Sequence, residues 1–410
     1  MVALVPLAAL VPGAVGPARA DITVQAMPSV GVGITDNAAA STTTTAPGGV
    51  FATGSVAVSG HYAGALVSHT LAYRLALTRF FEDSGPTVLT NAVAWTSSFK
   101  PTALLDIGLT ASALLSRLSR VDQNDLTTVM PQASVGGTTQ FLNIAVGETL
   151  SYQPTGTRTF EQELTVAQLR YIEADLDLPT STYVLGRVRG TVLAGRNSVY
   201  LDVQLADAYT PVDPAVAVNG FSTGHTLIGR VLAGWQRELS PSWSSNIAVG
   251  PLVMFTPEGN GIIAPAGVAS LIFARPPWFA TLAVSQQASP NLYLGQATLN
   301  DAALARVALP LTRSDLLFVT GFAGLIYARI ADNQGTLGRA FDQRTAGVAL
   351  NGRLQSLPLA AELLYTIVDQ NGGMIAGNMV PDFFRQTLML NVTGVFMWGK
   401  GTPPIFGGRP

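Results

Sequence analysis

Segments in which large apolar residues alternate with small or polar ones recur along most of this chain. In one of them every second residue is apolar: Ile107, Leu109, Ala111, Ala113 and Leu115. Successive side chains of a β-strand point to opposite sides of the sheet, so such a segment presents an apolar face and a polar face. A whole chain built from these segments predicts a β-barrel that spans a membrane.

The composition favours the same fold. Only 12% of the 410 residues are charged and the mean hydropathy is +0.34, whereas soluble domains carry about 25% charged residues. The sequence contains no unbroken apolar run of about 20 residues that could cross a bilayer as a helix. A closed barrel satisfies its backbone groups within lipid. A net charge of −2 argues against a polyanion-binding surface, and the lack of cysteine excludes disulfides and thiolate-bound metals.

Residues 1–20 are predicted to be a secretory signal peptide. Val2 to Val15 are apolar, and Ala18-Arg19-Ala20 supplies a small-x-small cleavage site before Asp21. Because no Lys or Arg precedes the apolar stretch, a start further upstream and an unusual N-terminal strand remain alternatives. The expected organisation is the signal peptide, a barrel over residues 21–398, and a short polar periplasmic tail over residues 399–410.

Short turns and longer loops alternate without a break. Eight turns rich in Pro, Gly, Ser or Asn are predicted at Gly60–Ala63, Lys100–Thr102, Pro154–Thr157, Gly195–Asn197, Ser240–Ser242, Arg275–Pro277, Leu311–Ser314 and Gln355–Pro358. Nine loops lie near 37–49, 82–86, 119–139, 176–180, 209–222, 257–260, 290–295, 332–340 and 371–382. The predicted fold is all-β, a single antiparallel up-and-down barrel of about 18 strands with both termini periplasmic. Misreading of the first hairpin (Ile22–Ser59) would leave 16.

Aromatic residues gather near the predicted strand ends. Tryptophan and tyrosine concentrate at membrane–water interfaces, where one end of the ring is apolar and the other is wet. The tryptophans beside the short turns or the chain end are therefore predicted to form a periplasmic girdle: Trp95, Trp235, Trp243, Trp278 and Trp398. An outer girdle is predicted from Tyr171, Tyr183, Tyr209, Tyr293, Tyr327 and Tyr365. The alternative is a soluble all-β protein with tryptophans beside its turns.

The last predicted strand carries a family resemblance. One of its faces holds Leu388, Leu390, Val392, Phe396 and Trp398. This strand resembles the terminal strand of bacterial outer-membrane β-barrel proteins, which ends in an aromatic residue read by the assembly machinery. Here Gly399 to Pro410 follow the aromatic residue, a departure from the family pattern. The resemblance implies a porin-like barrel of a Gram-negative outer membrane, without a subfamily, whose partners are membrane lipid and the assembly machinery.

Strand parity also assigns charged side chains to the lumen, because a charge facing lipid at mid-depth costs about 2–4 kcal/mol. The predicted lumen-lining residues are Arg74, Asp106, Glu161, Glu163, Arg187, Arg189, Asp202, Arg230, Arg306, Glu362 and Arg385. Their signs are mixed, so strong anion or cation selectivity is not predicted. They could form an electrostatic ladder that filters solutes, or cross-strand pairs that hold a polar interior together, and the two roles are compatible.

An 18-strand wall closes into a ring of roughly 36 Å backbone diameter, wide enough to hold water. The expected function is a channel that passes small polar solutes by diffusion, without cofactor, metal or nucleic acid. The longest loop, 119–139, either folds inward to narrow the pore or stays on the surface. The alternative functions are a scaffold for a periplasmic partner and a surface adhesin. Homo-oligomerisation remains open.

No catalytic site is predicted. Of His61, His69 and His225, only His225 lies where a rim hydrolase would need it, with Asp207 and Asp213 near in sequence. The simplest interpretation is a rim histidine in water. The Gly-Gly pairs at 48–49 and 372–373 lack the lysine and helix of a phosphate loop, and no spacing matches a metal site.

Overall fold

A computed structural model describes residues 21–36, 48–81, 87–117, 140–173, 180–211, 224–257, 259–291, 296–312, 316–331, 337–353, 357–375, 378–379 and 382–399. The predicted signal peptide, nearly all of the predicted tail and the 119–139 loop lie outside these residues, as do Asp213 and Tyr293. None of the described residues forms a helix that is long and apolar enough to span a membrane.

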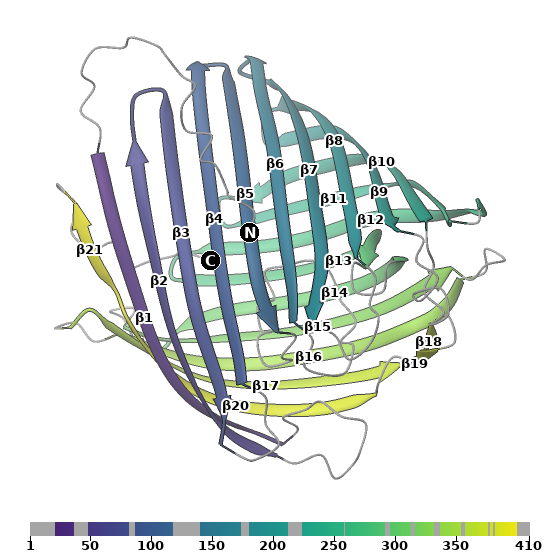
Figure 1. The fold of residues 1–410 in the computed structure, drawn as a ribbon. Coiled ribbons are helices and arrows are strands. Elements are labelled where there is room, and N and C mark those ends of the chain that lie inside the picture. Colours follow the sequence, from purple (N-terminus) through teal and green to yellow (C-terminus); the bar gives the residue numbers. More distant parts are fainter. Residues whose placement is uncertain are drawn as a thin grey trace.

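The described residues form β-strands throughout (Figure 1). The strands are β1 (Asp21–Thr35), β2 (Gly49–Ala63), β3 (Val67–Phe80), β4 (Thr87–Thr102), β5 (Leu105–Arg117), β6 (Gln140–Thr155), β7 (Arg158–Glu173), β8 (Ser181–Ala194), β9 (Asn197–Thr210), β10 (Gly224–Ser240), β11 (Trp243–Phe255), β12 (Gly261–Arg275), β13 (Trp278–Asn291), β14 (Gln296–Pro310), β15 (Leu317–Ala331), β16 (Leu337–Arg353), β17 (Leu359–Gly372), β18 (Met374–Ile375), β19 (Asn378–Met379), β20 (Phe383–Gly394) and β21 (Phe396–Gly399).

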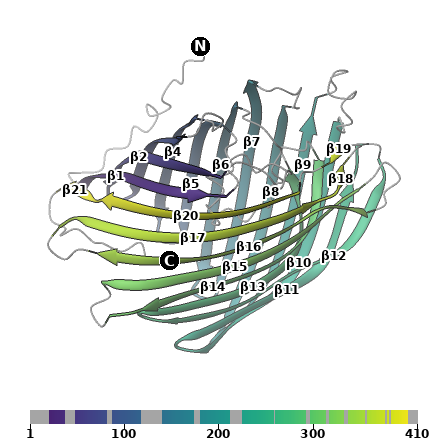
Figure 2. The same ribbon diagram turned by 90° about the horizontal axis from the view of Figure 1, so that it is seen from below.

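Each strand of the wall pairs antiparallel with its neighbours in the chain, and β1 closes the wall against β20 and β21 (Figure 2). β20 and β21 are two parts of one wall strand that is interrupted at Val395, so the described residues form a closed barrel of 18 strands. The 16-strand alternative is wrong, because β1 pairs with β2 from Asp21↔Ala63 to Thr35↔Gly49. β18 and β19 form a separate two-residue hairpin.

The two ends of the barrel differ. We call the end with the short turns the turn rim and the opposite end the loop rim. Thr23 pairs with Gly399, so the first and last described strands begin and end at the turn rim. The predicted turn at Gly60–Ala63 is wrong: these residues continue the ladder of β2 with β3, and the turn follows, closed by a 2.8 Å hydrogen bond from Gly64 N–H to the Val67 carbonyl.

Two predicted loops are shorter than expected, because backbone pairing carries the strands further toward the loop rim. β9 continues to Thr210, where it still pairs with Gly224 of β10. β16 begins at Leu337, opposite Ala331. Polar residues at these two strand ends look like loop in sequence, yet they extend the ladder. The predicted 371–382 loop instead contains the separate hairpin of β18 and β19.

The wall has an exposed apolar face and an opposite face of mixed character. On β9, Leu205 is 66% exposed while its near neighbour Asp202, of opposite parity, is 1% exposed. Trp235, Trp243, Trp278 and Trp398 are exposed near the turn rim. Trp95 is half-buried and stacks with His69, with ring centroids 6.1 Å apart. We call the face that carries these tryptophans the outer face, and its opposite the inner face.

The inner face is not uniformly polar. From β8 to β12 it carries a buried apolar cluster that includes Ile228, Leu232, Leu252 and Met254. Ala288, Ala297 and Leu299 of β13 and β14 belong to the same cluster, although the register gives them the parity of the outer face on their own strands. Tyr183 belongs to this cluster, so its predicted place in an outer girdle is wrong. Tyr171 packs against buried Phe141 and Leu169 instead of facing outward. Tyr209 and Tyr327 are exposed on the outer face.

Candidate functional site

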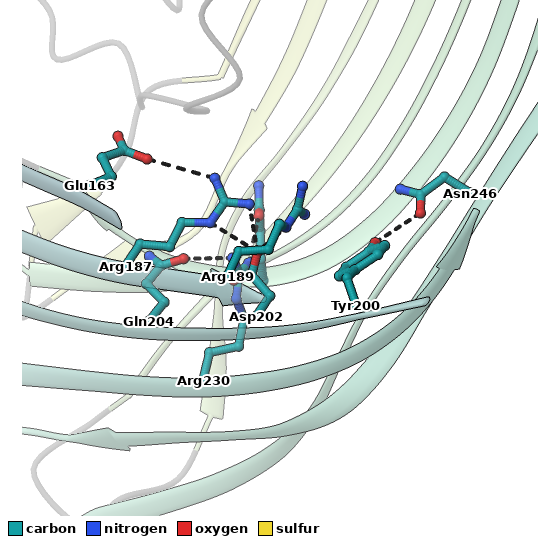
Figure 3. A network of polar contacts seen from close by, with 9 residues as sticks. Glu163, Arg187, Arg189, Tyr200, Asp202, Gln204, Arg230 and Asn246 are labelled. Atoms are coloured by element: carbon teal, nitrogen blue, oxygen red, sulfur yellow. Dashed lines mark hydrogen bonds and ion pairs between the residues drawn. The ribbon is translucent and has the colours of Figure 1, made fainter. Parts of the chain in front are cut away.

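Three neighbouring strands bring charged side chains together on the inner face. Arg187 and Arg189 are two residues apart on β8 and therefore share a face. The register sets Asp202 of β9 opposite Arg189, and Gln204 opposite Arg187. Arg230 of β10 lies on the other side of Gln204. We call Arg187, Arg189, Asp202 and Arg230 the arginine cluster (Figure 3).

Asp202 is the centre of the cluster. Its Oδ2 accepts hydrogen bonds from Arg187 Nε at 2.9 Å and from Arg189 Nε at 3.0 Å. Its Oδ1 lies 3.9 Å from Arg230 Nη2. The carboxylate is almost completely shielded from solvent. One buried acid thus accepts hydrogen bonds from two guanidinium groups and lies within ion-pair distance of a third. Hydrogen bonds between ions are the strong ones.

Arg230 links the cluster to a distant strand. It donates from Nη2 to Gln204 Oε1, and from Nη1 to Gln287 Oε1 of β13 at 3.2 Å. β10 and β13 are separated in the sheet by β11 and β12. A contact between their side chains therefore means that the wall bends sharply here, and that the two strands approach each other on the inner side.

A tyrosine extends the cluster along the wall. The guanidinium of Arg189 lies over the Tyr200 ring, 4.3 Å from its centroid, a cation–π geometry. The Tyr200 hydroxyl donates to Asn246 Oδ1 on β11 at 2.8 Å. The ring crosses β10 at Gly234, where a Cβ atom would lie 2.1 Å from Tyr200 Cζ. Glycine at this position is what allows the ring to reach the second strand away.

Positive and negative charges balance at this place. Glu163 of β7 adds a second acid, 3.6 Å from Arg187 Nη1, and Glu161 lies opposite Arg189 in the register, so three arginines share this face with three carboxylates. Within the described residues, the buried atoms Asp202 Oδ1 and Arg230 Nε make no hydrogen bond. The cluster thus offers a charged surface of mixed sign, fixed by short internal bonds, that can orient water and polar solutes.

Apart from Glu161, which lies opposite Arg189, the remaining predicted lumen-lining residues are spread around the barrel. Asp106 of β5 accepts from Ser98 Oγ at 2.7 Å and lies 3.3 Å from Lys100 Nζ near the turn rim. Arg385 of β20 is buried. The others are placed by register: Arg74 between Ala57 and Ala92, Glu161 between Ser151 and Arg189, Arg306 between Thr281 and Phe322, and Glu362 between Asn351 and Asn391.

His225 does not face the lumen. Its Nδ1 is 2.9 Å from Asp207 Oδ2, and its ring packs on Tyr209 with centroids 4.6 Å apart. Asp207 and Tyr209 have the parity of Leu205, so the group belongs to the outer face at the loop rim. Among the residues that the structure describes, no cluster of three or more His, Asp or Glu could hold a metal ion.

Several members of the site were not predicted as such. Tyr200 has the parity of Asp202, so strand alternation alone could have assigned it to the inner face. Gln287 and Asn246 are reached only through the bend of the wall and the space above Gly234. No feature of the sequence near Arg230 points to a strand that begins about 50 residues later.

Comparison with known proteins finds no sequence family and no curated protein that matches this chain. Three solved structures illustrate its structural likeness. Pseudomonas aeruginosa OpdQ has 9% identity and a TM-score of 0.48, with 93% of this chain and 100% of that chain covered. Acinetobacter baumannii OccAB2 has 9% identity and a TM-score of 0.49, with 92% of this chain and 98% of that chain covered. The siderophore receptor PirA from Pseudomonas aeruginosa has 10% identity and a TM-score of 0.46, with 91% of this chain and 80% of that chain covered.

The fold assignment itself comes from the strands. An even number of antiparallel strands, a closed wall and an apolar outer face that bears tryptophans near one rim are the properties of transmembrane barrels of bacterial outer membranes. This chain has the fold of a bacterial outer-membrane β-barrel protein.

Proposed function

We propose that the protein is a channel through which small polar solutes diffuse across the outer membrane. The observation that carries the proposal is the closed 18-strand wall with the arginine cluster on its inner face. Barrels of this strand number enclose a lumen wide enough for water. The fixed charges would act on whatever passes along that face of the wall.

The cluster also bears on charge selectivity. Its three guanidinium groups share the inner face with the carboxylates of Asp202, Glu161 and Glu163. Charges of both signs beside a water-filled path order water and polar solutes without strongly favouring one sign. We therefore propose that small polar solutes pass with little preference between anions and cations.

Conductance across a planar bilayer tests both statements. Purified protein should give stable current steps, and under a KCl gradient the reversal potential should lie close to zero. Replacing one exposed arginine of the cluster, Arg187→Gln, should move the reversal potential toward that of a cation-preferring channel, because one positive charge is lost from the path.

The matched control is Arg79→Gln, which removes an arginine of the same charge from the outer face of β3. It should leave the reversal potential unchanged. A membrane without current steps would overturn the channel proposal, and a co-purifying periplasmic subunit would then favour the scaffold alternative. Equal shifts in both variants would overturn the role of the cluster.

A further inference from the structure

The outer face carries a groove of about 1000 Å³ that spans β11 to β16. This volume lies at the upper end of the range for small-molecule sites. Its apolar part includes Ile247, Val249, Val284 and Leu325, all of which are exposed. Its polar part includes Arg339, Asp342 and Arg344. An apolar surface and charged side chains thus share one concave region.

Strand register places this groove outside the barrel. Val284 has the parity of Trp278 on β13. It pairs with Ala303, Ala303 pairs with Leu325, and Leu325 pairs with Arg344. Directly opposed residues in a sheet lie on the same face. Arg344 therefore projects on the face that carries the tryptophans, a position from which charges are normally excluded.

Depth along the strands separates the two parts. With a rise of about 3.3 Å per residue and a tilt of about 40°, Val284 lies about 15 Å above Trp278 along the barrel axis. By the same measure, Arg344 lies about 23 Å above Arg353, which ends β16 at the turn rim. The apolar band of such barrels is about 25 Å tall. Val284 thus lies at the depth of the acyl chains, and Arg344 lies at the loop-rim edge of the band, from which its long side chain reaches the headgroups.

The charged side chains in this region differ in how closely they are paired. Arg329 Nη2 donates to Asp301 Oδ2 at 2.7 Å, and Arg339 donates to Asp342, which also accepts from Asn371 Nδ2 at 3.1 Å. Arg344 has a longer ion pair, 3.8 Å to Asp369, and its side chain is 65% exposed. The charge that remains available at headgroup depth is therefore a guanidinium, which suits a phosphate.

We propose that this groove binds a phosphorylated lipid of the surrounding membrane, with its phosphate on Arg344 and an acyl chain along Val284 and Leu325. The site goes beyond the proposed channel function, because it lies on the opposite face of the wall from the arginine cluster. Its occupant is a membrane lipid because the apolar part lies at the depth of acyl chains and the guanidinium at the depth of headgroups.

Native mass spectrometry of the purified barrel in detergent tests the proposal. The probes are phosphatidylglycerol and a diacylglycerol with the same acyl chains, which lacks the phosphate. Phosphatidylglycerol should be retained more strongly. Arg344→Gln should lower its affinity about tenfold, the ratio expected for one lost hydrogen bond between charged groups, and should leave diacylglycerol retention unchanged.

Two further variants keep the test decisive. Arg79→Gln removes an arginine of the outer face that does not line the groove and should leave phosphatidylglycerol retention unchanged. Leu325→Trp fills the apolar part from an exposed position and should lower retention without affecting folding. Equal retention of the two lipids, or equal affinity of Arg344→Gln and the native protein, would overturn the proposal. So would a dimer that Leu325→Trp dissociates, because the groove would then be an interface between copies.

Discussion

Replacement of Gly250 by alanine should prevent the barrel from folding normally. A Cβ atom at this position would lie 1.8 Å from the carbonyl oxygen of Val231 on β10. Unlike a flexible side chain, this oxygen belongs to a strand that is paired on both sides, between Arg230↔Leu252 and Ala233↔Val249. We expect the free energy of unfolding to fall by more than about 4 kcal/mol, a loss seen only when a substitution cannot be accommodated.

The matched control is Gly54→Ala in β2, where no atom lies within 4 Å of the added Cβ. This change should alter stability by less than about 1 kcal/mol, and it can be stabilising because alanine loses less backbone entropy than glycine. Refolding from urea into detergent, followed by the heat-dependent mobility of the folded barrel in gel electrophoresis, measures both. A Gly250→Ala protein with the native urea midpoint would contradict the close approach of β10 and β11.

The second large effect is expected from Asp202→Asn. The amide keeps the shape of the carboxylate but removes the charge that holds Arg187 and Arg189. Removing one partner of a buried ion pair costs about 3–5 kcal/mol, since the other charges stay buried without compensation. We expect about 3 kcal/mol, because the arginine side chains are partly exposed. Added salt should recover part of the loss by screening the repulsion.

Asp106→Asn provides the comparison for this prediction. Asp106 forms an ion pair with Lys100 in which the side chains are 40% and 64% exposed, and exposed pairs contribute about 0–1 kcal/mol. Combining Asp202→Asn with Arg187→Gln should restore part of the lost stability, since it removes one of the repelling charges. Equal urea midpoints for Asp202→Asn and Asp106→Asn would show that the arginine cluster is not a buried charge centre.

Alternation along single strands was enough to predict much of this fold. Leu201 and Leu205 on one face of β9, with Asp202 on the other, follow from the period of two. The turn residues predicted the strand count. They misplaced the first turn at Gly60, because glycine permits a turn without requiring one. The backbone pairing of β2 with β3 decided the boundary.

The sequence did not predict how the wall bends from one strand to the next. Arg230 meets Gln287 because the sheet bends between β10 and β13, and Tyr183 is buried because the apolar cluster forms inside that bend. On β16, the bulge near Ala340 shifts the register, so Arg339 pairs with Arg329 and both face outward. A one-residue shift changes which face a side chain occupies, and only the partner strand reveals it.

The most direct test uses the lack of cysteine in the chain. Gln204→Cys places a single thiol within the arginine cluster, and Leu205→Cys places one on the adjacent, opposite face. Each variant is recorded in a planar bilayer while a charged, water-soluble thiol reagent is added. Modification of Gln204→Cys should change the size of the current steps, and the same treatment of Leu205→Cys should not. A protein without current steps, or a current altered only through Leu205→Cys, would contradict a solute path along the inner face.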